Sequence, residues 1–313
     1  MTGAFLTALF FASNAVCARR AALHYGGTTG NFLRLLLAVA LLAAWAHAAG
    51  QGTGGGAFAW FLLSGAVGFG LGGLTMFHAL PLIGSNLSML IVQCGSAVAA
   101  ALVEWLWLGS RLSLAQAGLA ALTLAGVAVA LIGPMGPIRP TGPIKPPTTN
   151  PPRFALGVAL AVVSACAQGG GAVISRKAFG LLHARGFFMD VATSAYQRAL
   201  GGLAIGTLAL LVVRWRPEAE PAVPEATVAA PAQALPPWVW VVLNTLLGPV
   251  FGVTCYQWAL RSNQAGVVLP IVATAPLLTV PIAWVLERSR PTPRYWTGAA
   301  IAVVAAAGLA MVK

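Results

Sequence analysis

Charged residues are the scarcest class in this sequence of 313 residues. Asp and Glu number 6 and Lys and Arg 18, and together they make up 8% of the chain. A soluble globular protein carries roughly 25% charged residues, because water must solvate its surface. Hydrophobic residues reach 58% instead. This balance excludes a soluble enzyme, a disordered chain and a disulfide scaffold, and it predicts an all-α polytopic membrane protein.

Cysteines are also few, and they are not grouped. All four lie inside apolar runs without metal-ligand spacing: Cys17, Cys94, Cys166 and Cys255. We expect them to be small buried hydrophobes, with no metal and no cofactor. No P-loop, H-E-x-x-H or G-x-S-x-G string occurs. The G-x-G-x-x-G string at 68–73 lies inside an apolar run, where the strand and helix of a dinucleotide site are not expected.

The net charge of +12 would suggest a nucleic-acid partner in a soluble protein. Here Lys and Arg occur one to three at a time between apolar runs, which is typical of membrane topology. We therefore expect a lipid bilayer around the chain and no nucleic-acid partner. The first apolar run begins at Gly3 without a preceding basic region, which favours a first span over a cleavable signal.

Long apolar runs follow one another along the whole chain. A membrane-spanning helix needs about 20 mostly apolar residues. On that rule the sequence predicts ten spans, at 3–18, 31–49, 58–77, 82–106, 112–132, 154–174, 190–213, 238–258, 265–286 and 295–312. An even number of spans places both termini on one side of the membrane.

Two proline-rich stretches separate some of these runs. Residues 133–153 contain eight prolines and residues 214–237 contain six, as is typical of extended linkers. The first stretch divides the chain into a five-helix repeat at 1–132, a linker at 133–153 and a second five-helix repeat at 154–313.

The two parts resemble each other in sequence. A shift of 180 residues aligns 60–120 with 240–300, with 11 identities in 61 positions that include Trp60/Trp240, Gly68/Gly248 and Gly72/Gly252. Earlier in each half, Arg19-Arg20-Ala21 resembles Arg176-Lys177-Ala178, and Phe32-Leu33-Arg34 resembles Tyr196-Gln197-Arg198. A repeat with an odd number of spans is inverted relative to its copy. Inverted repeats are a recurrent plan of secondary transporters, with the substrate site near the midplane.

Small residues recur at equivalent places in both halves. Gly68-x-x-x-Gly72 and Gly248-x-x-x-Gly252 form small-xxx-small faces, which predict close helix packing. The ninth span contains Pro270, Pro276 and Pro281, whose missing N–H groups indicate either curvature or an opened backbone that lines a polar cavity.

Polar side chains within spans are rare and therefore informative. For each one alone, an interhelical hydrogen bond is at least as plausible as a ligand contact. As a set from several spans they predict a central substrate site made of Asn14, His78, Gln93, Gln168, Asn244, Tyr256 and Trp258. Arg198, deep in its span, is a further candidate that pairs either with an acid or with an anionic substrate. The set lacks a carboxylate, which favours a neutral or zwitterionic solute over a lipophilic cation.

The third to fifth spans carry a pattern similar to a known family. Phe77-His78-Ala79-Leu80 is followed by Glu104-Trp105-Leu106-Trp107-Leu108-Gly109-Ser110-Arg111-Leu112-Ser113, then Gln116 and Gly118. The pattern resembles the ten-helix EamA-type branch of the drug/metabolite transporter superfamily, with Ser110 in place of an acidic residue. The second half is looser, with Tyr256-Gln257-Trp258-Ala259-Leu260 and Glu287-Arg288. The resemblance implies a secondary transporter of small organic metabolites, amino acids among them, that is not an enzyme.

We expect such a transporter to be an integral protein of a bacterial inner membrane, monomeric or weakly dimeric, and to act in export. An integral-membrane enzyme acting on lipids and a non-transporting partner subunit are the alternatives. The family implies cytoplasmic termini, whereas ten Lys and Arg residues on one side against six on the other favour the opposite orientation.

Overall fold

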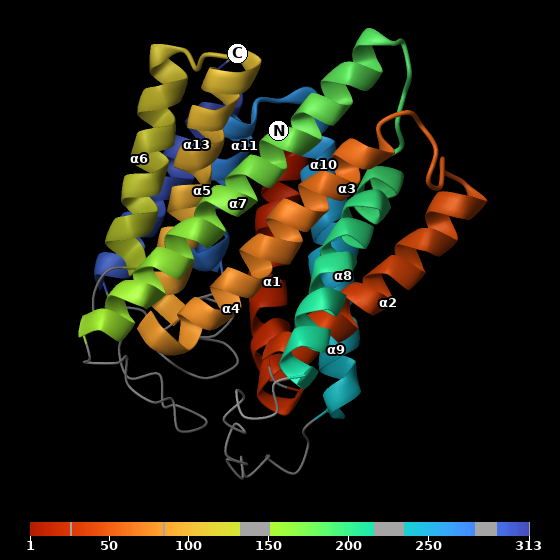
Figure 1. Ribbon diagram of the computed structural model, residues 1–313. Helices are drawn as coiled ribbons and strands as arrows, with labels where there is room; N and C mark the ends of the chain where they lie inside the picture. Colours follow the sequence, from red (N-terminus) through yellow and green to blue (C-terminus); the bar gives the residue numbers. More distant parts are fainter. Residues whose placement is uncertain (26, 84, 132–150, 216–234, 279–292, 313) are drawn as a thin grey trace.

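The structure, a computed structural model, describes residues 1–25, 27–83, 85–131, 151–215, 235–278 and 293–312. Within these ranges the regular structure is helical and forms an upright bundle (Figure 1). The first half contains α1 (Thr2–Tyr25), α2 (Gly27–Ala48), α3 (Phe58–Gly65), η1 (Ala66–Leu71), α4 (Gly72–Ile83), α5 (Ser85–Leu108) and α6 (Leu114–Leu131). The second contains α7 (Pro151–Ala184), α8 (Val191–Trp215), α9 (Pro237–Thr245), η2 (Leu246–Gly252), α10 (Val253–Ser262), α11 (Ala265–Val272) and α13 (Pro293–Met311).

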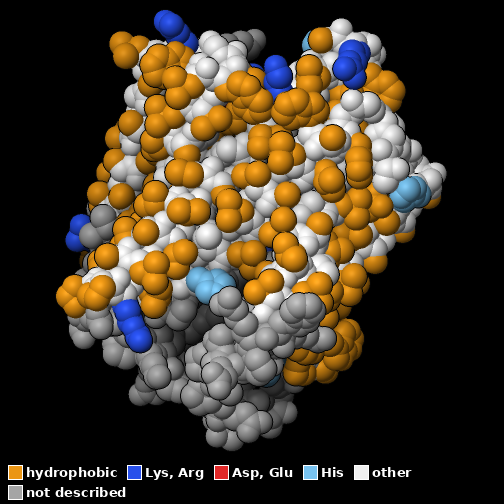
Figure 2. All heavy atoms as spheres, in the orientation of Figure 1, with side chains coloured by type: hydrophobic (Ala, Val, Ile, Leu, Met, Phe, Trp, Pro, Cys, Tyr) orange, Lys and Arg blue, Asp and Glu red, His pale blue; other side chains and the backbone are white. Residues whose placement is uncertain are grey.

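Apolar side chains cover the outside of this bundle. Large hydrophobic residues are exposed along its helices, among them Leu36, Leu102, Leu208 and Val304. Figure 2 shows apolar side chains spread over the visible face, with Lys and Arg toward its edges. A helix satisfies its own backbone hydrogen bonds, so this surface suits lipid. The chain is an integral, multi-pass membrane protein.

Among the described residues, 8 helices are long and apolar enough to cross a membrane. Two of the ten predicted spans are not among them. The span predicted at 3–18 lies within α1, and the span predicted at 265–286 continues past the described residues from a shorter apolar helix at Ala265–Leu278. Both termini lie toward the upper end in Figure 1.

The first helix of the second half is longer than its apolar run suggested. The sequence predicted a span at 154–174, but α7 runs from Pro151 to Ala184. The helix thus begins inside the predicted linker 133–153, because Pro151 and Pro152 belong to its first turn, which tolerates proline. Arg176 and Lys177, which follow the end of the predicted span, are also helical.

Two π-helical segments interrupt the bundle at equivalent positions. They are η1 and η2, which begin at Ala66 and Leu246, 180 residues apart. Each closes on a backbone bond across five residues, from Gly72 N to the Val67 carbonyl and from Val253 N to the Gly248 carbonyl. Pro249 lies only in η2, so the missing proline N–H is not the sole cause of the π-helical turn. Such π segments are frequent at functional sites.

The glycines at the C-terminal ends of these turns, Gly72 directly after η1 and Gly252 as the last residue of η2, pack closely on the first helix of the other half. Ser164 Oγ on α7 donates a 2.7 Å hydrogen bond to the Gly72 carbonyl. Thr7 Oγ1 on α1 lies 3.4 Å from the Gly252 carbonyl. A Cβ on Gly72 would lie 3.0 Å from Gln168 Cγ, and one on Gly252 would lie 2.7 Å from the Phe11 ring. Both glycines therefore lie in close contacts, as small-xxx-small faces require.

A second pair of crossings also has an equivalent in each half. A Cβ on Gly65 of α3 would lie 1.7 Å from the Arg198 carbonyl of α8, and one on Gly201 would lie 1.9 Å from the Leu62 carbonyl. In the other half, Thr245 Oγ1 of α9 lies 3.4 Å from the Arg34 carbonyl of α2. The second helix of each half thus crosses the third helix of the other.

The proline-rich ninth run is interrupted rather than evenly curved. α11 ends at Val272, and a turn at Ala273 and Thr274 separates it from the next helical turn. The Tyr295 hydroxyl on α13 donates a hydrogen bond to the Leu277 carbonyl. The residue four positions ahead of Leu277 is Pro281, which has no N–H to donate. Pro281 itself lies outside the described residues.

Candidate functional site

The best candidate for a functional group is the buried arginine of α8. Arg198 is 2% exposed, and it is the eighth residue of its helix. At 1.5 Å per residue this places its Cα about 11 Å below the upper end of α8, well inside a hydrocarbon core of roughly 30 Å. A charge at that depth is costly unless it has partners, and such residues mark functional sites in membrane proteins.

Neutral groups from two other helices bind the guanidinium. Arg198 Nη1 donates to Gln257 Oε1 on α10 at 3.2 Å and approaches Ser175 Oγ on α7 at 3.4 Å. Ser175 Oγ in turn lies 2.8 Å from Ser64 Oγ on α3, which donates to the Gly171 carbonyl at 2.6 Å. Four helices from both halves of the chain therefore contribute to this polar cluster.

Aromatic rings face the same guanidinium. Its central carbon lies 4.7 Å from the centroid of the Phe69 ring on η1 and 5.4 Å from that of the Tyr256 ring on α10. A cation over an aromatic face is attracted by the ring quadrupole, and this attraction is strongest away from water. We call Ser64, Phe69, Ser175, Arg198, Tyr256 and Gln257 the Arg198 cluster.

A glycine makes room for the charged head. A Cβ on Gly68 would lie 2.8 Å from Arg198 Nη2 and 3.7 Å from Gly171 Cα. The residue lies in the π-helical turn η1, next to Phe69, whose ring faces the same guanidinium. The glycine predicted to pack helices therefore also adjoins the charged group.

The buried carboxylate of the described chain lies elsewhere. Glu104 on α5 is 2% exposed, forms an ion pair with Arg176 on α7 and accepts a 3.0 Å bond from Gly266 N in the first turn of α11. Asp190 caps α8, because its Oδ2 accepts from Thr193 N at 2.8 Å and Thr193 Oγ1 at 3.0 Å. These acids have structural partners, and neither of them pairs with Arg198.

Metal ions in proteins require groups of ligand side chains. Among the described residues, no group of three or more His, Cys, Asp and Glu side chains could hold a metal ion. The four cysteines are free thiols, and the expectation that all of them are buried is wrong, because Cys17 is buried, Cys94 and Cys255 are partly exposed and Cys166 is exposed.

The residues predicted for the substrate site do not form one group. Tyr256 belongs to the Arg198 cluster. Asn14 lies against Gly248, with its side-chain atoms 2.9–3.0 Å from where a Cβ would be. Asn244, four residues before that glycine, is 4% exposed. The side-chain oxygens of both asparagines are buried and have no hydrogen-bond partner within the described residues.

The amides of α5 and α7 lie apart from these. Gln168 donates to Ser164 Oγ at 3.2 Å on its own helix and contacts Gly72, while Gln93 is half-buried on α5. His78 is exposed, and its Nδ1 lies 2.8 Å from the Leu74 carbonyl one turn earlier. Trp258 is 42% exposed. Both side chains lie on the surface.

Sequence reasoning missed four members of the cluster, which are Ser64, Phe69, Ser175 and Gln257. Gln257 is polar and inside a span, and this signal could have found it. Ser64, Ser175 and Phe69 carried no such signal, because serine and phenylalanine are ordinary residues in membrane helices. Only the fold brings them to Arg198.

Comparison with known proteins agrees with this helical plan. The model of the EamA-like transporter family matches residues 1–132 and 155–311. The chain belongs to that family. The resemblance to the EamA-type branch of the drug/metabolite transporter superfamily is thus confirmed. A solved crystal structure matches 98% of this EamA-like chain and 96% of its own, with a TM-score of 0.71 and 20% sequence identity, which shows a shared fold. No curated protein matches the sequence.

Proposed function

We propose that this EamA-like chain is a secondary transporter that moves a small organic metabolite, neutral or zwitterionic, by alternating access. In this proposal ten spans form two inverted five-helix repeats, 1–132 and 154–313, in a bacterial inner membrane, and export is the expected direction. The membership in a transporter family supports the general activity. The observation that carries the finer proposal is the Arg198 cluster, a buried polar group built from both halves.

Equivalent contacts support the inverted repeat. Thr7 and Ser164 are 157 residues apart, which is also the shift that relates Arg19-Arg20-Ala21 to Arg176-Lys177-Ala178. Each lies beside the carbonyl of the glycine at the C-terminal end of the π-helical turn of the other half. Arg34 and Arg198, matched at a shift of 164, each present a carbonyl to the third helix of the other half. Contacts that repeat between different helices at fixed shifts are expected of two copies of one fold.

The position of the cluster supports alternating access. It lies between α3 and η1 of the first half and α7, α8 and α10 of the second. Two rigid repeats that rock about this contact would expose the cluster to one side of the membrane and then to the other. Asn14, Asn244 and Gln168 lie at the other contacts between halves and complete the proposed path.

The test is counterflow into liposomes that contain the purified protein. Liposomes are preloaded with a pool of unlabelled amino acids, and uptake of each labelled amino acid is followed at equal external concentration. The proposal predicts transient uptake that requires both the protein and the preloaded solute. The proposal is overturned if neither preloaded nor empty proteoliposomes take up any of the amino acids or other small metabolites tested.

A further inference from the structure

Hydrogen-bond donors are in excess around Arg198. Its Nη1 binds Gln257 and Ser175, but its Nε is buried and has no hydrogen-bond partner among the described residues. A guanidinium only donates, so Gln257 must turn its oxygen toward it. The amide nitrogen of Gln257 is therefore left buried, and within the described chain it has no acceptor. Two unpaired donor groups thus accompany one buried positive charge.

The buried guanidinium and the two unpaired donor groups have no anion among the described residues that would accept their hydrogen bonds. A buried charge and buried donors without partners each lower stability, so a site that keeps both is suited to a ligand that supplies the missing acceptors. A carboxylate has two oxygens that accept several hydrogen bonds, and it matches the forked geometry of arginine. Resting on the transport function proposed above, we propose that Arg198 and Gln257 bind the carboxylate of the transported solute.

The charge of the cluster narrows the class of solute. Arg198 is its one cation among the described residues, and no described carboxylate faces it. A single negative charge on the solute neutralises the site, whereas a dianion such as a phosphate monoester leaves excess charge in a medium of low dielectric constant. The ammonium of an amine finds no acid in the cluster and is repelled by the guanidinium. The site therefore selects solutes that carry a carboxylate over amines and over neutral amides, and a zwitterion fits when its ammonium lies away from the guanidinium.

The aromatic rings of the cluster position the Arg198 guanidinium for binding a carboxylate. Phe69 and Tyr256 face the guanidinium, and Nη1 is fixed by Gln257 and Ser175, so the head group keeps its place when no anion is present. The neighbouring residue Gly68 has no side chain, so the space next to the guanidinium stays free for it. A positioned arginine loses less freedom when it binds a carboxylate than a mobile one.

The experiment compares acids with their uncharged or decarboxylated analogues. Proteoliposome counterflow is measured for each transported amino acid, its carboxamide and the amine that lacks the carboxyl group, using wild type, Arg198→Gln, Gln257→Leu and Arg111→Gln. Arg111 is exposed and serves as the matched control. We expect wild type and Arg111→Gln to carry the acid at least tenfold faster than the amide or the amine. Arg198→Gln should lose at least nine-tenths of acid transport, and Gln257→Leu should raise KM for the acid.

The outcomes separate this inference from the transport function. Transport of amides or amines by wild type without preference for acids overturns the carboxylate assignment alone, as does acid transport by Arg198→Gln at the wild-type rate. Counterflow of inorganic phosphate but of no amino acid overturns it too. If Arg198→Gln does not fold in detergent, an unchanged KM in folded Gln257→Leu contradicts the inference. Wild type that transports no solute overturns the proposed function.

Discussion

Arg198 and Gly68 fit together as a charged head and the space left for it. The two residues belong to different halves of the chain, and a Cβ on Gly68 would lie 2.8 Å from Arg198 Nη2. Gly68 is also part of the π-helical turn η1. A glycine whose repeated position is visible in the sequence therefore lies next to the buried cation of the Arg198 cluster.

The first prediction concerns Gly68→Ala. The added methyl group should displace the guanidinium from Gln257 and Phe69 and lower transport several-fold, while the protein remains folded because the neighbouring atom is the end of a side chain. The matched control is Gly118→Ala on α6, where a Cβ meets nothing within 4 Å. Counterflow rates and melting temperatures of both variants are the measurement. Equal transport by the two variants would show that Gly68 does not position Arg198.

The second prediction concerns the polar residues predicted from the sequence. Asn244→Ala and Tyr256→Phe should reduce transport with expression and melting temperature near wild type, because both remove a polar atom from the contact between halves. Gln93→Ala tests the half-buried amide of α5 in the same assay. The control is Trp258→Phe, a change on an exposed side chain. Wild-type transport by Gln93→Ala, Asn244→Ala and Tyr256→Phe alike would remove them from the solute path.

The third prediction concerns the ion pair of Glu104 and Arg176, which joins α5, α7 and α11. Removing one partner of a buried pair leaves an uncompensated charge, which costs about 3–5 kcal/mol. Because Arg176 is 24% exposed, we expect a smaller loss for Glu104→Gln than for Arg176→Gln. A double-mutant cycle of unfolding in mild detergent measures the coupling. Additive effects would contradict a direct interaction.

The fourth prediction concerns the close helix contacts. Leu at Gly72 or Gly252 should separate the helices and destabilise the fold by about 1–3 kcal/mol, as overpacking does. Gly180→Leu on α7 is the control, since a Cβ there meets nothing within 4 Å. Thermal unfolding in detergent gives the comparison. If all three variants melt at one temperature, the small-xxx-small interpretation is wrong.

Much of the fold follows from the sequence, because apolar runs and glycine spacing respond to local physics. Most predicted spans overlap described helices, and Gly72 and Gly252 lie at close contacts. The length of α7 could not be predicted, because Arg176 and Lys177 look like loop residues. In the structure Arg176 forms an ion pair with Glu104. The helix can therefore continue through a charged residue at which a rule based on apolar runs ends the span. Only tertiary packing reveals that partner.

The site was less predictable than the fold. In-span polarity found Tyr256 and pointed to Arg198, since polar groups in hydrocarbon need partners. It also selected His78 and Trp258, which are exposed. Composition cannot show which face of a helix turns inward when both faces are apolar.

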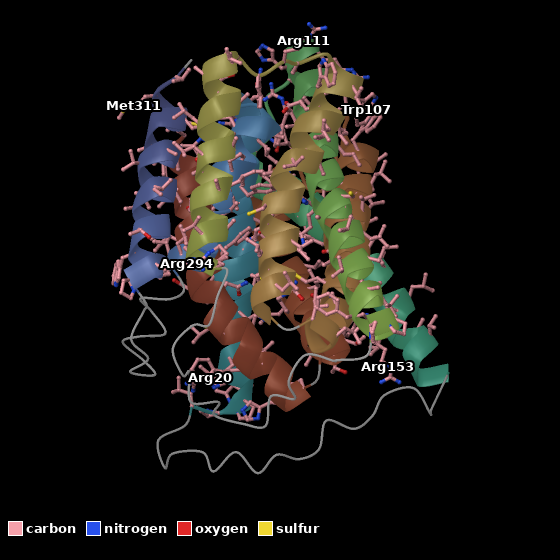
Figure 3. The ribbon with its side chains drawn as sticks, turned by 90° about the vertical axis from the view of Figure 1, so that its left-hand side faces the viewer. Arg20, Trp107, Arg111, Arg153, Arg294 and Met311 are labelled. Carbon is pink, nitrogen blue, oxygen red and sulfur yellow. The ribbon has the colours of Figure 1, made fainter. Side chains whose placement is uncertain are left out.

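Arginines lie toward both ends of the bundle, as Figure 3 shows. The figure labels Trp107, Arg111 and Met311 in the upper half and Arg20, Arg153 and Arg294 in the lower half. The orientation follows from reporter fusions at both termini. An even number of spans predicts that the two fusions report the same side, whereas opposite sides would contradict ten spans.

The most direct test of the account asks whether the Arg198 cluster is reached from both sides of the membrane. Ser175→Cys is made in a chain whose four native cysteines are replaced by alanine, and it is labelled with a membrane-impermeant anionic thiol reagent in right-side-out and in inverted vesicles. The account predicts labelling from both faces, slowed by a transported amino acid and not by its carboxamide. If Ser175→Cys is labelled from one face only, or from neither face, both with and without solute, the result contradicts alternating access at this site.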